Sequence, residues 1–210
     1  MTHIVLLGDS IFDNGAYVRG GPDVVHQLRD IVPEGWRASL LAVDGATTSG
    51  VAGQLGRLPV DATHLVVSAG GNDALGASHL LGSPARSVGD AVARLAAAQD
   101  AFASDYQDMV EGVVATGLPS ILCTIYDTPQ TSAEHRMIRS ALALFNDEIS
   151  RAAFSRRLPL IDLRLVCGAA EDYANPIEPS VQGGEKIAAA ILHAVAATRA
   201  PADFSFVVNA

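Results

Sequence analysis

The chain has 210 residues, of which 49% are hydrophobic and 18% are charged, and this composition excludes a disordered, collagenous or coiled-coil protein. Fourteen lysine and arginine residues oppose 23 aspartate and glutamate residues, and the resulting net charge of −9 disfavours binding to nucleic acid or to anionic membrane surfaces. The apolar runs are far shorter than the roughly 20 residues that a membrane-spanning helix needs, so we expect a soluble protein without a membrane span.

Short apolar runs alternate with longer amphipathic stretches along the chain, and no linker or repeat divides residues 1–210, so we expect one α/β domain. The short runs are almost continuously hydrophobic, which is typical of strands buried on both faces of a parallel sheet. In chain order, the five expected strands are His3–Gly8, Trp36–Val43, His64–Ala69, Ser120–Ile125 and Leu160–Leu165. Apolar residues at helical spacing predict helices over 95–113, 142–149 and 187–195.

Strands joined by helices predict a three-layer α/β/α sandwich around a five-stranded parallel, flavodoxin-like sheet, because right-handed crossovers place helices on both faces. In such a sheet, the loops at the carboxyl ends of the strands form the functional site. Polar and glycine residues occupy these loops here, at 8–10, 44–46, 70–73, 126–127 and 175–184.

The start of the chain and its two cysteines indicate a reducing compartment. Met1 is followed almost directly by the first apolar run, without the basic and long hydrophobic segments of a secretory signal. Cys123 and Cys167 both lie in apolar stretches, which is typical of buried free thiols. We therefore expect a cytoplasmic protein.

Three of the loops supply a nucleophile and hydrogen-bond donors to one edge of the sheet. Ser10 follows the first strand, where its hydroxyl and its own N–H can face the same point. Gly45 adds an unscreened backbone N–H, and Asn72 adds a side-chain amide, so three donors can converge on an oxyanion. Each of the three is, by itself, also an ordinary turn or capping residue.

In this order, each after a successive strand, these segments resemble the GDSL or SGNH hydrolase family, whose four blocks are named for Ser, Gly, Asn and His. The resemblance covers nearly the whole chain, from Gly8-Asp9-Ser10-Ile11 through Gly45 and Gly70-Gly71-Asn72-Asp73 to the segment 179–184. It implies a serine esterase or lipase-like hydrolase that acts on a small-molecule ester. By the same resemblance, Ser10 is the nucleophile, and the N–H groups of Ser10 and Gly45 form the oxyanion hole with the Asn72 amide.

The last block departs from the family pattern. The family usually has Asp-x-x-His before a turn that begins with proline, whereas this chain has Asn175-Pro176-Ile177-Glu178. Glu178 therefore stands in the position of the histidine, and Asn175 stands in the position of the aspartate. Pro179 and the glycines that follow fix this register.

The candidates for the general base are Glu178 and two of the six histidines. His79 and His135 follow strands on the correct side of the sheet, but each is more typical of a solvated loop or a helix start. Burial would raise the pKa of Glu178 from about 4.3, and a rise of about one unit would keep a glutamate base active near pH 5.5. Asn175 can hydrogen-bond Glu178 without adding a second negative charge. We therefore expect Glu178 to take the serine proton.

Two other interpretations fit some of the same residues. The replacements at the last block also fit a catalytically inactive ligand-binding protein on the same scaffold. A group of aspartates at the strand ends offers the oxygen ligands that Mg²⁺ prefers, but acidic turn residues commonly cap turns and helices. This group comprises Asp9, Asp13, Asp44 and Asp73. We expect neither a metal nor a cofactor.

Overall fold

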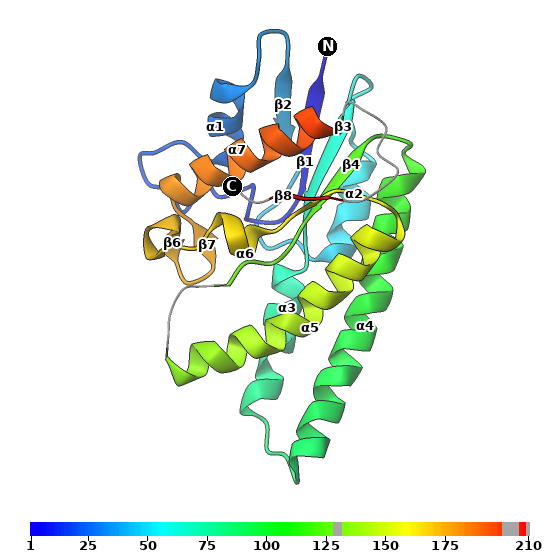
Figure 1. The fold of residues 1–210 in the computed structure, drawn as a ribbon, viewed down its shortest axis with the longest axis vertical. Helices are drawn as coiled ribbons and strands as arrows, with labels where there is room; N and C mark the ends of the chain where they lie inside the picture. Colours follow the sequence, from blue (N-terminus) through cyan, green and yellow to red (C-terminus); the bar gives the residue numbers. More distant parts are fainter. Residues whose placement is uncertain (128–131, 199–205, 209–210) are drawn as a thin grey trace.

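The computed structural model describes residues 1–127, 132–198 and 206–208, and its centre is a six-stranded parallel sheet (Figure 1). The strands lie in the order β2-β1-β3-β4-β5-β8, and the first five follow the doubly wound order of flavodoxin-like sheets. Their bounds are β1 His3–Gly8, β2 Arg37–Leu40, β3 His64–Ser68, β4 Ser120–Cys123, β5 Leu160–Ile161 and β8 Val207–Val208. The predicted parallel α/β sandwich is confirmed.

The prediction of five strands was wrong, because β8 adds a sixth strand beside β5. A strand of two residues carries no alternation of apolar and polar positions that a sequence pattern could reveal. The expected strand Leu160–Leu165 was also too long. Asp162 ends it by accepting the backbone N–H of Arg164, which starts the short helix α6 (Leu163–Val166).

Helices cover both faces of the sheet (Figure 1). Helices α1 (Val24–Ile31) and α7 (Val181–Ala197) pack on one face, and α2 (Val51–Leu55), α4 (Val88–Ala115) and α5 (Ala133–Ser155) pack on the other. The remaining helical elements are α3 (Gly71–Ala77) and the 3₁₀ turns η1 (Thr48–Gly50), η2 (Ser78–Gly82) and η3 (Ala170–Asp172). Among the described residues, no helix combines the length and apolar character that crossing a membrane requires.

Strand β1 divides its side chains between two hydrophobic cores. Ile4 and Leu6 pack with α1 and α7, whereas Val5 and Leu7 pack with α4 and α5, and all four are fully buried. This is the alternation that a strand buried on both faces requires. Each such side chain contributes about 1.5–3 kcal/mol by its burial, so β1 is firmly held up to the residue where the site begins.

Three helices extend past the carboxyl ends of the strands. Figure 1 shows α3 and the amino-terminal parts of α4 and α5 beyond the edge of the sheet. The buried residues of α4 all lie in its second half, between Phe102 and Val113, and α3 has none. The projecting parts therefore face one another rather than the sheet, and they enclose space next to the ends of the strands.

Candidate functional site

Ser10 lies on a tight turn that leaves β1. Gly8, at the start of this turn, has a φ of +119°, and a Cβ at this position would lie 1.7 Å from the carbonyl oxygen of Ser68 on β3, so only glycine fits. The side chain of Gln54 binds both backbone groups of Gly8: its Oε1 accepts the N–H at 2.7 Å, and its Nε2 donates to the carbonyl at 2.8 Å. These contacts fix the position from which the Ser10 hydroxyl projects.

The Ser10 hydroxyl contacts a carboxylate from the other end of the chain. Ser10 Oγ donates a hydrogen bond of 3.0 Å to Glu178 Oε1 across 168 residues of sequence. Glu178 begins β7 (Glu178–Pro179), which pairs antiparallel with β6 (Tyr173–Asn175) in a separate two-stranded sheet. The buried Asn14 side chain donates to the Pro179 carbonyl at 3.2 Å, so the loop that follows Ser10 also binds the strand of Glu178.

Asn175 shapes the turn that carries Glu178. It pairs with Glu178 across β6 and β7, and its side-chain oxygen accepts the backbone N–H of Ile177 at 2.9 Å. Tyr126 Oη, after β4, donates to the Ile177 carbonyl at 3.0 Å. Asn175 thus closes the turn. The hydrogen bond from Asn175 to the Glu178 carboxylate that the sequence suggested is not found among the bonds of the described residues.

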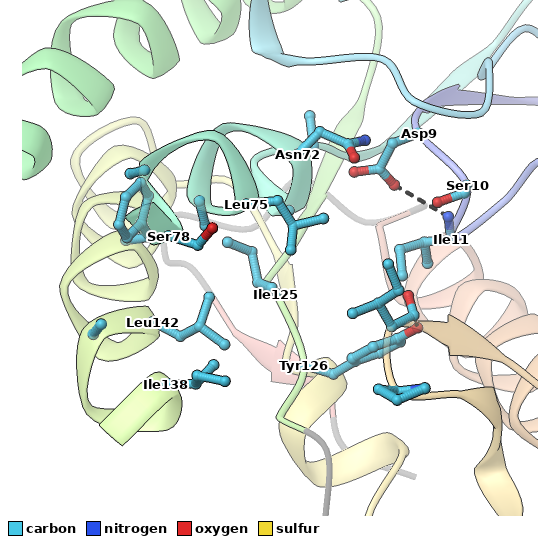
Figure 2. Close-up of a pocket in the computed structure, with 18 of the residues that line it drawn as sticks. Asp9, Ser10, Ile11, Asn72, Leu75, Ser78, Ile125, Tyr126, Ile138 and Leu142 are labelled. Carbon is cyan, nitrogen blue, oxygen red and sulfur yellow. Dashed lines mark hydrogen bonds between the residues drawn. The ribbon is translucent and has the colours of Figure 1, made fainter. Parts of the chain in front are cut away.

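Two buried carboxyl groups flank Ser10. Glu178 is 4% exposed, and burial raises its pKa to about 7 against the opposing effect of the hydrogen bond from Ser10, with the charge of Asp44 raising it further. Its Oε2 atom is buried without a hydrogen-bond partner among the described residues. Burial also raises the pKa of Asp9 to about 7, although Asp9 accepts the N–H of Ile11 at 3.1 Å (Figure 2). Both carboxyl groups therefore change charge near neutral pH.

Asn72 and its neighbour hold two loops of the site together. Asn72 Nδ2 donates to the carbonyl of Ala46 at 2.9 Å, and because an amide group carries two N–H donors, the second can serve a ligand. Asp73 accepts the backbone N–H of Thr48 at 3.0 Å and its hydroxyl at 2.7 Å. Gly45 lies in the same loop after β2, exposed and with a φ of +77°. The loops after β2 and β3 therefore form one connected rim.

A cavity of about 210 Å³ opens beside Ser10. Of the residues predicted for the site, Ser10, Asn72 and Glu178 line it, whereas Gly45 and Asn175 are not among its described lining residues. Figure 2 shows the cavity extending from Ser10 past Leu75 and Ile125 to Ile138 and Leu142 on α5. The structure thus unites three of the five predicted residues in one cavity, and the other two lie in turns next to it.

The two histidine alternatives have different surroundings. His135 lies in the first turn of α5, is half-buried and lines the cavity, and its Nδ1 lies 2.6 Å from Ser132 Oγ. Ile138, one turn further along α5, lies at the end of the cavity away from Ser10 (Figure 2). His79 is exposed, and its Nδ1 contacts the carbonyl of Gly76 at 3.0 Å. Neither residue has the direct contact with Ser10 that Glu178 has.

The aspartates considered as magnesium ligands are engaged within the turns. Asp13 accepts the backbone N–H of Asp44 at 2.9 Å, and Asp44 accepts the hydroxyl of Tyr17 at 2.8 Å. Together with the bonds of Asp9 and Asp73, these contacts match the expectation for acidic turn residues. No group of three or more histidine, cysteine or carboxylate side chains in the described ranges is arranged to hold a metal ion.

Asn14 and Gln54 contribute to the site but were missed in the sequence. Both are buried, and both bind backbone groups of segments distant in the chain. For Asn14, its place four residues after Ser10 in the same loop was an available signal. Gln54 lies in a five-residue helix without a motif, so only the folded arrangement identifies it.

Comparison with known proteins gives one family and many related folds. A model of the GDSL-like lipase/acylhydrolase family matches residues 6–186. An α/β hydrolase, LAE5, from the metagenome of Lake Arreo has 20% identity and a TM-score of 0.69, covering 95% of this chain and 97% of its own. An extracellular lipase from Streptomyces rimosus has 18% identity and a TM-score of 0.67, covering 94% and 99%.

A third solved structure, the carbohydrate acetylesterase Est24 from Sinorhizobium meliloti, has 11% identity and a TM-score of 0.67 and covers 94% of this chain and 100% of its own. At these identities, the likeness shows a shared fold. No curated protein matches the sequence significantly.

Proposed function

The chain belongs to the GDSL-like lipase/acylhydrolase family, and on that basis we propose that it hydrolyses carboxylic esters with Ser10 as nucleophile and Glu178 as general base. The observation that carries this proposal is the 3.0 Å hydrogen bond from Ser10 Oγ to Glu178 Oε1 at the polar end of a cavity. A nucleophile and a base within hydrogen-bond reach are the minimum arrangement for serine catalysis.

In the first half of the reaction, Ser10 Oγ attacks the ester carbonyl carbon while its proton passes to Glu178 along their hydrogen bond. The negative charge that develops on the carbonyl oxygen is stabilised by the Ser10 N–H and the free proton of the Asn72 amide, with the Gly45 N–H as the third donor. The bond to the alcohol oxygen then breaks, Glu178 returns the proton to that oxygen, and the alcohol leaves an acyl group on Ser10.

In the second half, Glu178 accepts a proton from a water molecule that attacks the acyl carbon. The bond to Ser10 Oγ breaks, Glu178 gives the proton back to Ser10, and the carboxylic acid is released. The same carboxylate thus acts as base and then as acid in each half, as microscopic reversibility requires.

Burial supplies the basicity that a histidine would otherwise provide. A glutamate with an ordinary pKa is a weak base, whereas the pKa of Glu178 is raised to about 7, close to the histidine reference value of about 6.5. A base whose pKa lies near the working pH is the most efficient, since it is both ionised and able to hold a proton. We assign Asn175 a positioning role, through the turn that presents Glu178.

Labelling by a fluorophosphonate tests the proposal. The Ser10 oxygen should form a bond to phosphorus as fluoride leaves, and peptide mass spectrometry should find the adduct on Ser10 alone. Ser10→Ala should remain unlabelled, whereas Ser78→Ala, a change to another serine that lines the cavity, should be labelled as the wild type is. An adduct that persists in Ser10→Ala would contradict the assignment of the nucleophile.

The alternative is a ligand-binding protein without catalysis, and the replacement of the usual histidine and aspartate by Glu178 and Asn175 is the observation that favours it. This alternative predicts that neither labelling nor ester hydrolysis occurs at any pH, while small molecules still bind in the cavity. Hydrolysis that depends on Ser10 would exclude it.

A further inference from the structure

The segments that surround Ser10 carry negative charge without positive charge. Hydrogen bonds join four of them, at 9–18, 41–50, 69–78 and 171–180, into one unit around the serine. Each of the four contains at least one aspartate or glutamate, and their sequences contain no lysine or arginine. A site lined by one sign of charge attracts ligands of the opposite sign and repels those of the same sign. The charge around Ser10 therefore favours a cationic substrate.

Asp13, Tyr17 and Asp44 form a group next to Ser10 that is not part of the described lining of the cavity, and we call this group the acidic face. Asp44 Oδ2 accepts the Tyr17 hydroxyl at 2.8 Å, and the Asp44 backbone N–H donates to Asp13 at 2.9 Å. Asp44 is exposed and directly precedes Gly45. Its Oδ1 atom has no hydrogen-bond partner among the described residues. The acidic face thus offers a free carboxylate oxygen beside an aromatic ring.

Electrostatic effects connect the acidic face to Glu178. Burial raises the pKa of Glu178 to about 7 against the hydrogen bond from Ser10, and the charge of Asp44 adds to the rise. In turn, the charge of Glu178 contributes to the raised pKa of Tyr17, of which the hydrogen bond to Asp44 is the largest cause. Glu178 is 4% exposed, and its Oε2 atom has no partner among the described residues. Its ionised form therefore lacks compensation, which a positive charge at the acidic face would supply.

We propose, resting on the ester hydrolysis proposed above, that the acidic face binds a cationic group in the alcohol part of the ester, so that the substrates are esters of amino alcohols. The alcohol part is assigned to this face because Glu178 must return a proton to the alcohol oxygen, which places that oxygen next to Glu178. Asp44 and Gly45 are exposed. The amino alcohol can therefore leave to solvent once the bond between its oxygen and the acyl carbon has broken, while the acyl group stays on Ser10.

The acidic face distinguishes three classes of alcohol by their charge. A protonated amine can donate to the free oxygen of Asp44, and a quaternary ammonium ion can bind through its charge and through contact with the ring of Tyr17. A neutral alcohol of the same shape gains neither interaction. An alcohol that carries a phosphate or a carboxylate is repelled by the surrounding carboxylates. Cationic esters should therefore react best and anionic esters worst.

The first experiment compares kcat/KM on butyrylcholine and on 3,3-dimethylbutyl butyrate. In the second ester a carbon atom replaces the quaternary nitrogen, so the two substrates share their shape and differ in charge. At low ionic strength, the wild type should prefer butyrylcholine by at least about tenfold. Because Asp44 is exposed, about 0.5 M salt should reduce this preference severalfold. Equal values for the two esters at low ionic strength would overturn the proposal.

Two variants separate the acidic face from the overall charge of the protein. Asp44→Asn keeps the size of the side chain but removes its charge, and it should reduce the preference for butyrylcholine at least about threefold. Asp108→Asn removes the same charge from an exposed position on α4 and should keep the preference of the wild type. An equal reduction in both variants would mean that the net charge of −9 causes the preference, and it would overturn the proposal.

The second experiment separates the cationic site from the catalytic proposal. Ser10→Ala is titrated with the same two esters, and the amide signals of Asp44 and Gly45 are followed by NMR. Butyrylcholine should have a Kd at least about fivefold lower than its neutral counterpart, and the added change Asp44→Asn should abolish this difference. Such binding without ester hydrolysis in the wild type would reject the catalytic proposal alone. Hydrolysis of both esters with equal kcat/KM and equal Kd would reject the cationic site alone.

Discussion

Near each end of β1, a serine hydroxyl takes part in a hydrogen-bonded arrangement, here called a relay: Ser39 of β2 contacts His3 at the amino end, and Ser10 follows the carboxyl end. The surroundings of the two serines differ. At the amino end, His3 Nε2 lies 2.8 Å from Ser39 Oγ, and His3 Nδ1 lies 3.2 Å from Asp61 Oδ1. This is the connectivity of a Ser-His-Asp triad. At the carboxyl end, Ser10 binds Glu178 directly, without a histidine between them.

Although the amino-end relay has the connectivity of a triad, its surroundings are typical of a contact that stabilises the fold. Ser39 lies within β2, paired in register with β1, rather than on a turn at the end of a strand. The Asp61 side chain is 53% exposed and forms an ion pair with Arg37, which competes for the charge that would orient His3. Burial, and then Arg37, lower the pKa of His3. Connectivity alone therefore does not define a reactive serine; a cavity and unused donors beside it are also required.

The largest difference between the two relays should appear in activity when each serine hydroxyl is removed. Ser10→Ala should reduce kcat/KM on an activated ester by at least about a thousandfold, because the nucleophile is lost. Ser39→Ala should retain full activity. Steady-state kinetics on both variants provides the measurement. A large loss of kcat/KM in Ser39→Ala would indicate that the amino-end relay, and not Ser10, carries out the reaction.

Replacement of the Glu178 carboxylate tests whether this residue is the general base, the role that a histidine usually has. Glu178→Gln keeps the shape of the side chain but cannot accept the Ser10 proton, so kcat/KM should fall at least about a hundredfold. His135→Ala should stay within about threefold of the wild type. The opposite pattern would make His135, which also lines the cavity, the base.

The pH profile should show a smaller change with a definite sign. Only ionised Glu178 can accept a proton, and its pKa is raised to about 7, so kcat/KM should rise with pH and level off above about 8. Activity at pH 5.5 should be about thirtyfold below the plateau. The sequence led us to expect activity near pH 5.5, but that figure assumed a rise of only about one unit. A plateau that persists below pH 5.5 would contradict the burial effect.

Removing the Ser39 hydroxyl at the amino end should lower the stability of the fold. Ser39→Ala leaves the buried Nε2 atom of His3 without its partner, which should cost about 1–3 kcal/mol and lower the melting temperature by several degrees. Thermal denaturation followed by circular dichroism checks this, with the exposed Ser140→Ala as control. A melting temperature equal to that of the wild type would mean that the relay does not stabilise the fold.

At the carboxyl end, replacing Glu178 should raise the melting temperature, and by less than the loss of the Ser39 hydroxyl lowers it. The pKa of Glu178 is higher in the folded protein than its reference value of 4.5, so its contribution to stability is fully present below about pH 4.5 and is lost as pH rises through about 7. Glu178→Gln removes this titration and should melt about one to three degrees above the wild type at pH 8, with the difference disappearing towards pH 4.5. An equal difference at both pH values would contradict the mechanism.

The parts of the fold and site that depend on local pattern were predictable. Long apolar runs such as β1 and β3 identified the sheet, and the block order brought Ser10, Asn72 and Glu178 to one cavity. The hydrogen bond of Asn175 was not predictable, because it depends on the geometry of the turn between β6 and β7. The size of the pKa shift of Glu178 likewise depends on burial by segments that are far apart in sequence.

The projection of α4 beyond the sheet divides this helix into a half with buried residues and a half without them. Its second half is anchored by buried residues from Phe102 to Val113, whereas its first half lines the cavity through Leu95 and Ala98 without a buried residue. Segments with few buried contacts open locally at low free energy, while anchored segments open only with the whole domain. We therefore expect amide hydrogen exchange to be slower in residues 102–113 than in the first half of α4, which forms part of the cavity wall.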